Sequence, residues 1–223
     1  MAAGPLTVDA PPSPAAAARL DAQLAFVRAL DGLKGVIRRT RLADGSRREN
    51  SAEHSWHLAA MAVVLAEYAP AGADVARAVR MLLVHDVVEI EAGDTFAFAA
   101  LADPAVAAAQ AAREARAAER LFGLLPADQA AELHALWTEF EAAHAPGGTP
   151  TARFAVALDR LQPLLQNAAQ PAATAGGTWR EAGVTLAAAL RRMAPVRAGA
   201  PALWPVVEAT LAEAVAAGHL AAP

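Results

Sequence analysis

The sequence predicts an all-α protein, and three properties of its composition support that fold class. Of its 223 residues, 56% are hydrophobic, and 65 alanines make up about half of that hydrophobic total. Alanine has the highest helix propensity, whereas strands favour β-branched and aromatic residues, and aromatic residues account for only 5% of the chain. Charged residues amount to 19%, which together with the hydrophobic content excludes wholesale disorder. A chain of 223 residues can bury a substantial core without disulfide bonds.

Apolar residues recur at helical spacing, and glycine, proline and aspartate separate the helical segments. The first expected helix covers residues 15–37, and a polar stretch with an Asp44-Gly45 turn follows it. Ser51 is the expected N-cap of a second helix that ends near residue 68. The run 81–84 is apolar on every side, so the third helix, residues 74–90, is expected to be the central buried one. After a loop with Phe96 and Phe98, helices are expected at residues 104–122, 127–144, 150–168, 178–193 and 201–217.

These segments form one expected domain of about eight helices, over residues 15–220, because neither an internal repeat nor a shift in composition divides the chain. Residues 1–14 are rich in alanine and proline and are expected to be a disordered lead-in rather than a signal peptide. The net charge of −4 argues against a nucleic-acid partner, and no long uncharged apolar run indicates a membrane span. The chain has no cysteine, so disulfides and thiolate metal sites are excluded, and a cytoplasmic location is the default expectation.

A His85-Asp86 pair stands inside the most apolar helical segment of the sequence. Burying an imidazole and a carboxylate side by side costs several kcal/mol unless another group compensates them. A divalent cation is the best partner, since imidazole and carboxylate together suit first-row metals. The remaining ligands would have to come from other helices.

Two further polar residues lie in otherwise apolar helical surroundings and can complete such a site. His54 is in the first turn of the second helix, and Asp159 lies in the segment Phe154 to Leu161. Each has a simpler interpretation, a surface or capping histidine for His54 and a salt bridge to Arg160 or Arg153 for Asp159. Taken together, a His, a His-Asp pair and a distal Asp on three helices favour a metal site.

This arrangement resembles the HD-domain metal-dependent phosphohydrolases, whose signature is a lone His, a His-Asp pair and a distal Asp. The segments around them, residues 48–55, 83–90 and 91–95, are similar to the branch that contains bacterial 5′-deoxynucleotidases. The resemblance covers roughly residues 24–167 and implies an HD-domain-like helical bundle. It also implies one divalent cation, such as Mn, Co, Mg or Zn, and a homodimer. The implied metal ligands are His54, His85, Asp86 and Asp159.

The same resemblance implies roles for three residues around the cation. Glu89 matches a residue that orients or activates the attacking water, Asp94 one that contacts the sugar, and Arg39 a phosphate-binding arginine. The residue after that arginine is a tryptophan in the characterised deoxynucleotidases, but Thr40 stands here. The loss of an aromatic wall puts the same substrate in doubt.

The residues themselves leave alternatives to these roles. Glu89 shares a helix face with His85 and Asp86, where it can take a proton from water, but a salt bridge to Arg77 or Arg80 is the alternative. Asp94 can also be a turn or capping residue. Arg39 lies in an arginine-rich segment, residues 38–48, which can attract a phosphate or be a solvated loop.

The leading hypothesis is therefore a phosphomonoesterase that converts (deoxy)nucleoside 5′-monophosphates to nucleoside and phosphate. One alternative keeps the metal and changes the substrate to another small phosphoester. A second alternative is a non-catalytic helical sensing or interaction module that the metal only stabilises. Retention of the four ligands together with Glu89 and Arg39 favours an enzyme.

Overall fold

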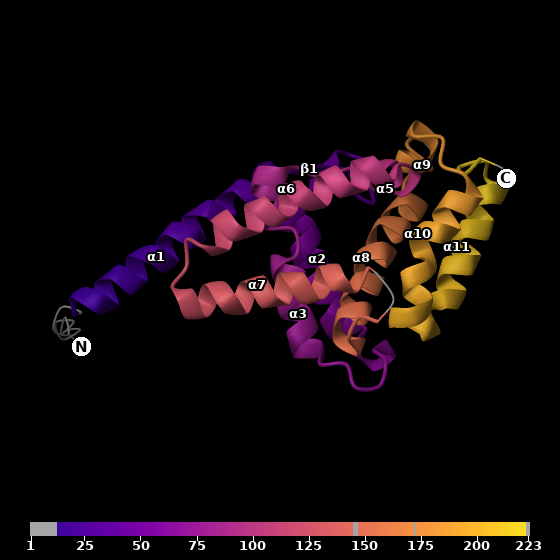
Figure 1. The fold of residues 1–223 in the computed structure, drawn as a ribbon. Helices are drawn as coiled ribbons and strands as arrows, with labels where there is room; N and C mark the ends of the chain where they lie inside the picture. The colour runs from indigo at the N-terminus through magenta and orange to yellow at the C-terminus, as the bar shows by residue number, and fades with distance from the viewer. Residues whose placement is uncertain (1–12, 145–146, 172, 222–223) are drawn as a thin grey trace, which may run out of the picture.

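The computed structural model describes residues 13–144, 147–171 and 173–221, and it confirms the all-α prediction. Helix α8 runs through the middle of the molecule, with α2 and α3 on one side and α10 and α11 on the other (Figure 1). Helices α1, α6 and α7 extend together toward the N-terminal end. The α-helices are α1 (Pro14–Leu30), α2 (Ser51–Val64), α3 (Val75–Val84), α4 (Glu89–Ala92), α5 (Ala97–Ala102), α6 (Pro104–Phe122), α7 (Ala127–Ala142), α8 (Pro150–Ala169), α9 (Gly177–Glu181), α10 (Leu186–Gly199) and α11 (Trp204–Ala216).

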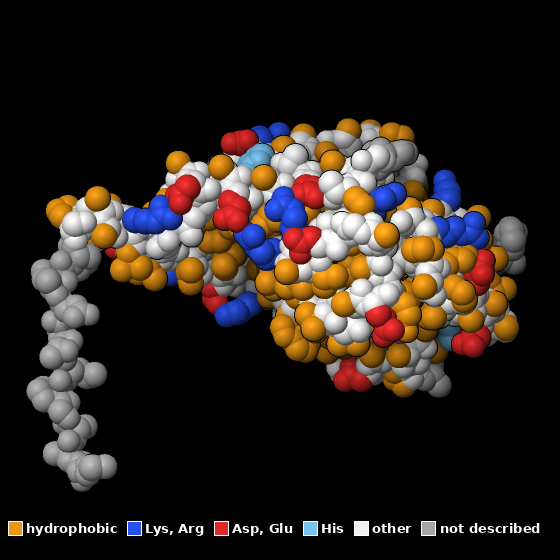
Figure 2. Space-filling view, turned by 90° about the horizontal axis from the view of Figure 1, so that it is seen from below, with side chains coloured by type: hydrophobic (Ala, Val, Ile, Leu, Met, Phe, Trp, Pro, Cys, Tyr) orange, Lys and Arg blue, Asp and Glu red, His pale blue; other side chains and the backbone are white. Residues whose placement is uncertain are grey.

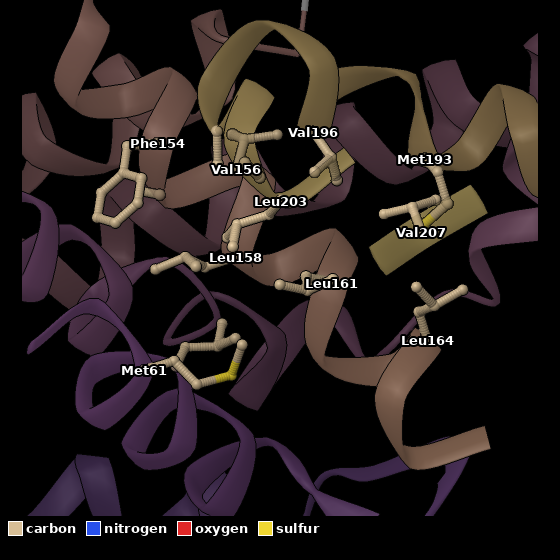
Figure 3. Packing of buried hydrophobic residues seen from close by; sticks show 14 of the residues in the cluster. Met61, Phe154, Val156, Leu158, Leu161, Leu164, Met193, Val196, Leu203 and Val207 are labelled. Carbon is tan, nitrogen blue, oxygen red and sulfur yellow. The ribbon is translucent and has the colours of Figure 1, made fainter. Parts of the chain in front are cut away.

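Helix α8 is the central buried helix, in place of the segment 74–90 expected from the sequence. Thirteen of its 20 residues are buried, among them apolar residues such as Phe154 and Leu158 and also the charged Asp159. Its side chains Phe154, Leu158 and Leu161 pack against α2, α10 and α11 (Figure 3). The expectation for residues 74–90 was wrong because only one face of α3 is covered, so that Leu83 is 48% exposed.

A second, smaller core lies between helices α1, α6 and α7. Phe26 of α1 and Phe122 of α6 lie with ring centroids 6.4 Å apart, and Trp137 of α7 packs in the same cluster. Val87 and Val88, just after the His-Asp pair, belong to this cluster too. The segment that carries the pair is therefore anchored from the side opposite α8.

The first predicted helix is shorter than expected, and a β-hairpin replaces its end. Helix α1 stops at Leu30, a 3₁₀-helix covers Asp31–Gly35, and strand β1 (Ile37–Arg41) pairs antiparallel with β2 (Arg48–Asn50). The Asp44-Gly45 turn connects these strands, with Gly45 at φ +70° and the Asp44 carboxylate accepting from the Ser46 amide. Residues 1–12 of the expected lead-in lie outside the described residues, and Ser13 caps α1.

The expected third helix is broken at the His-Asp pair. Helix α3 ends at Val84, and the backbone then forms tighter i to i−3 hydrogen bonds before α4 begins at Glu89. Such a turn changes the directions of successive side chains, which lets His85 and Asp86 face one point. Gly93, at φ +72°, ends α4 as expected.

Other helix ends differ from the prediction for local reasons. Asn50, not Ser51, is the N-cap of α2, and it forms a capping box with Glu53. The Ser51 hydroxyl instead donates to Glu89. The loop after Gly93 contains the short helix α5, and the predicted helix 178–193 is split into α9 and α10 at Gly183, where φ is +60°.

Charged side chains of both signs lie on the molecular surface (Figure 2). Acidic and basic side chains are interspersed over the face shown in Figure 2, without a broad basic patch. No described helix is long and apolar enough to cross a membrane.

Candidate metal centre

The N-terminal end of α2 and the middle of α8 bring His54 and Asp159 together. The His54 side chain is fully buried, and its Nε2 lies 3.0 Å from Asp159 Oδ1. Its other ring nitrogen, Nδ1, lies 3.1 Å from the Gln162 amide oxygen, which can only accept a hydrogen bond. His54 is therefore held as the Nδ1–H tautomer, with the lone pair of Nε2 directed at Asp159.

His85 is oriented in the same way by the turn that follows α3. Its Nδ1 donates to the carbonyl oxygen of Leu82, 2.9 Å away, so that its Nε2 faces Asp86 Oδ1 at 3.0 Å. This buried Nε2 atom has no hydrogen-bond partner among the described residues. Ligand atoms of His54, His85 and Asp159 all lie within 4.8 Å of one another.

This donor set fits a divalent cation. Two imidazole lone pairs face carboxylate oxygens, so acceptor faces acceptor unless a proton or a cation lies between them. Asp86 also belongs to the cluster, because its Oδ2 lies 4.0 Å from His54 Nε2. Two histidines and two aspartates form a mixed nitrogen and oxygen set that suits several first-row metals. The four predicted ligands are therefore brought together.

Electrostatic contacts keep both carboxylates of this cluster ionised. Burial would raise the pKa of Asp86, but a protonated His85 and Arg38, whose Nη1 lies 2.8 Å from Oδ2, lower it to about 2. Burial acts likewise on Asp159, and Arg160 holds its pKa well below the usual value. The predicted salt bridge from Asp159 to Arg160 thus exists together with the cluster.

Glu89 lies beside the cluster and faces it from the first turn of α4. Its Oε2 accepts a 2.6 Å hydrogen bond from the Ser51 hydroxyl and lies 4.0 Å from Arg38 Nη1. Burial and the negative charge of Asp86 raise the pKa of Glu89 well above its ordinary value. The alternative salt bridges do not form among the described residues, since Arg77 pairs with Glu139 and Arg80 with Glu132.

Arg38 and Arg39 are neighbours in β1, so their side chains point to opposite faces of the hairpin. Arg38 points inward, with its side chain 11% exposed between Asp86 and Glu89, while Arg39 is exposed at the edge of the site. The guanidinium of Arg39 lies over the ring of Phe96, 4.9 Å from its centroid. The family resemblance implied a role for Arg39, but nothing in the sequence indicated that Arg38 would contact the cluster.

A polar network behind His54 was also missed. Buried Glu49 of β2 accepts from the side-chain amides of Gln162 and Gln166 at 2.7 and 2.8 Å, and its other oxygen lies 3.4 Å from His54 Nδ1. His57 also contacts this network, with its Nδ1 3.2 Å from the side-chain amide nitrogen of Gln162. One signal was available: Gln162 and Gln166 follow Asp159 by three and seven residues, on the same face of an apolar helix.

The cluster opens into a cavity of about 430 Å³, a size typical of sites for small organic ligands. Asp94 and Arg39 both line this cavity, as do Phe96 and Phe98 of the loop and helix that follow α4. Thr40 is also at the wall, where the resembling enzymes have tryptophan. Burial raises the pKa of Asp94, partly opposed by Arg38. Arginines Arg38, Arg39, Arg160 and Arg192 also line the cavity.

A buried set of histidine and aspartate ligands between helices, open to an arginine-lined cavity, is typical of helical metal-dependent hydrolases of phosphate esters. A model of the HD-domain family matches residues 30–204, and the chain belongs to that family.

Known proteins resemble the chain at two levels of sequence identity. The crystal structure of a predicted metal-dependent phosphohydrolase from Magnetospirillum magnetotacticum MS-1 is 51% identical, covers 92% of this chain and all of its own, and superposes with a TM-score of 0.81. The 5′-deoxynucleotidases HDDC2 of Homo sapiens and Bos taurus are 32% identical over 144 residues. That match covers 64% of this chain and 65% of each relative, less than two thirds of their length.

Proposed function

We propose that the chain hydrolyses nucleoside 5′-monophosphates, with a preference for deoxyribose, to nucleoside and phosphate. The observation that carries the proposal is that the buried ligand cluster opens into a cavity that four arginines and the rings of Phe96 and Phe98 also line. The resemblance to 5′-deoxynucleotidases supports the nucleotide as substrate.

In this proposal His54, His85, Asp86 and Asp159 hold one divalent cation. When bound, the cation would supply Lewis acidity toward the phosphate and lower the pKa of water. Glu89, fixed by Ser51, orients the attacking water and takes up its proton, which its raised pKa favours. Arg39 neutralises phosphate charge at the cavity edge, and Asp94 accepts a hydrogen bond from the sugar.

The test is phosphate release from a panel of ribo- and deoxynucleoside monophosphates, in the presence of Mn, Co, Mg or Zn. We expect turnover of monophosphates, and we expect D86A to lose metal binding and phosphate release together. Activity that survives in D86A would refute the assignment. Full metal loading without turnover of any phosphoester would instead favour a non-catalytic module.

Thr40 makes a different phosphoester the second candidate. Without the tryptophan of the resembling enzymes, the wall near the sugar is smaller and more polar. Turnover of non-nucleotide monoesters at rates equal to those of deoxynucleotides would support this candidate. The homodimer and the cytoplasmic location remain expectations, and size-exclusion chromatography with light scattering tests the former.

A further inference from the structure

Four arginines line the cavity, and three of them have evident partners. Arg38 pairs with Asp86, and Arg160 with the Asp159 carboxylate and with His144 Nδ1 at 2.9 Å. Arg39 lies over the ring of Phe96. Arg38 and Arg160 are therefore neutralised by carboxylates of the protein, whereas Arg39 is exposed to solvent at the edge of the site.

Arg192 of α10 is the fourth, and it differs from the others. Among the described residues its guanidinium takes part in neither a hydrogen bond nor an ion pair, and its side chain is half-buried at the cavity wall. Burial and the positive charge of Arg160 lower the pKa of Arg192 to about 9, so it still carries its charge at neutral pH. A cation in such surroundings is unfavourable unless an anion joins it.

The position of Arg192 directs this charge toward the ligand cluster. Arg192 lines the same cavity as Asp86 and Asp159 of the cluster and as Asp94, and the charges of Asp159, Arg38 and Asp94 act on it. Helix α10 is closely seated on α8, because a Cβ at Gly199 would meet the Arg153 carbonyl oxygen at 1.9 Å. Gly199 follows Arg192 by seven residues, two helical turns, so both face α8.

We propose that Arg192 is a substrate-binding residue that contacts the phosphate of a monoester. The guanidinium fork matches two phosphate oxygens, and the otherwise unneutralised charge is most useful to a dianion. Arg192 therefore favours monoesters over the singly charged diesters. This inference rests on the proposed function and names the residue that selects its substrate class.

The experiment compares R192Q with R192K and with R191Q, in which the exposed neighbouring arginine is changed. Isothermal titration of inorganic phosphate into Mn²⁺-loaded protein measures anion binding without turnover. We expect the phosphate Kd to rise about 10- to 100-fold in R192Q, less in R192K, and not at all in R191Q. The melting temperature of R192Q should stay equal or rise, because a desolvated charge is removed.

Kinetics with a deoxynucleoside monophosphate and with bis(4-nitrophenyl) phosphate complete the test. R192Q should raise KM for the monoester by a similar factor and change the diester KM little. Phosphate binding equal in R192Q and wild type, or undetectable in both, overturns the proposal, as does a melting temperature lowered by several degrees in R192Q. If wild type binds phosphate through Arg192 but turns over no nucleotide, the proposed function fails and the anion site remains.

Discussion

The two sides of the cavity are built differently. Toward α2, His54 is backed by buried groups that contact one another, with Glu49 accepting from two glutamines. Toward α7 and α10, Glu141 and Arg192 carry ionisable groups whose pKa values burial shifts toward the neutral form. The first side fixes ligand atoms before any cation arrives, whereas the second leaves charge to be completed by a bound molecule. In the proposed function, metal binding and substrate binding therefore fall to different helices.

The largest effect is expected from substituting a proposed metal ligand, because these ligand atoms are already held in place. H85Q removes one imidazole lone pair while an amide can still donate to the Leu82 carbonyl, so the turn is retained. We expect metal content after dialysis to fall to background and phosphate release to drop about 10³-fold or more. H134Q on α7, whose ring lies between Phe122 and Trp137, is the matched control and should keep both. Stoichiometric metal in active H85Q would contradict the site.

A smaller effect is expected from substituting Glu49, which contacts the proposed ligand His54 but not the cation. In E49Q an amide NH₂ would face either the glutamine amides or the Nδ1–H of His54, so one donor would meet another. Groups that orient metal-ligating histidines typically contribute 10- to 100-fold in metal affinity, and we expect that loss in a competition titration. E53Q, which alters an exposed ion pair to Arg47 in the same segment, should bind metal as wild type does. Unchanged affinity in E49Q would show that the two sides differ less than proposed.

Much of the candidate metal site could be predicted from the sequence because its proposed ligands are polar residues in apolar helices. His54, His85, Asp86 and Asp159 stand out by that contrast alone. The structure places ligand atoms of His54, His85 and Asp159 within 4.8 Å of one another, with Asp86 beside them. Composition was enough for the fold class, since an alanine-rich chain with few aromatics has little to form strands with.

The rest depended on tertiary contacts that no local pattern records. The hairpin at Ile37–Asn50 forms between segments that contain no strong alternation, and it decides that Arg38 rather than Arg39 turns inward. The helix breaks after Val84, which lets His85 and Asp86 face one point, and this break too was not visible in the local pattern. Arg192 lies more than a hundred residues from this pair and could not be linked to it without the packing of α10 on α8.

The smallest expected effect concerns Glu141 on the open side of the cavity. Burial, reinforced by Glu114, raises the pKa of Glu141 from 4.5 to about 7. Between these values the folded protein binds more protons than the unfolded chain, so the stability of wild type falls as the pH rises through this window. E141Q does not titrate and escapes this loss.

The melting temperature of metal-free E141Q should therefore match wild type near pH 4.5 and exceed it increasingly up to pH 7, with a constant gap above. The side chain is 35% exposed, so solvent screening reduces the gain to about 1 kcal/mol or less, some 2–4 °C for a chain of this length. E132Q, an exposed change on the same helix, should show no such growth. A gap that is independent of pH would mean that Glu141 is not desolvated. On this side of the cavity, burial would then shift the pKa of Arg192 but not that of Glu141.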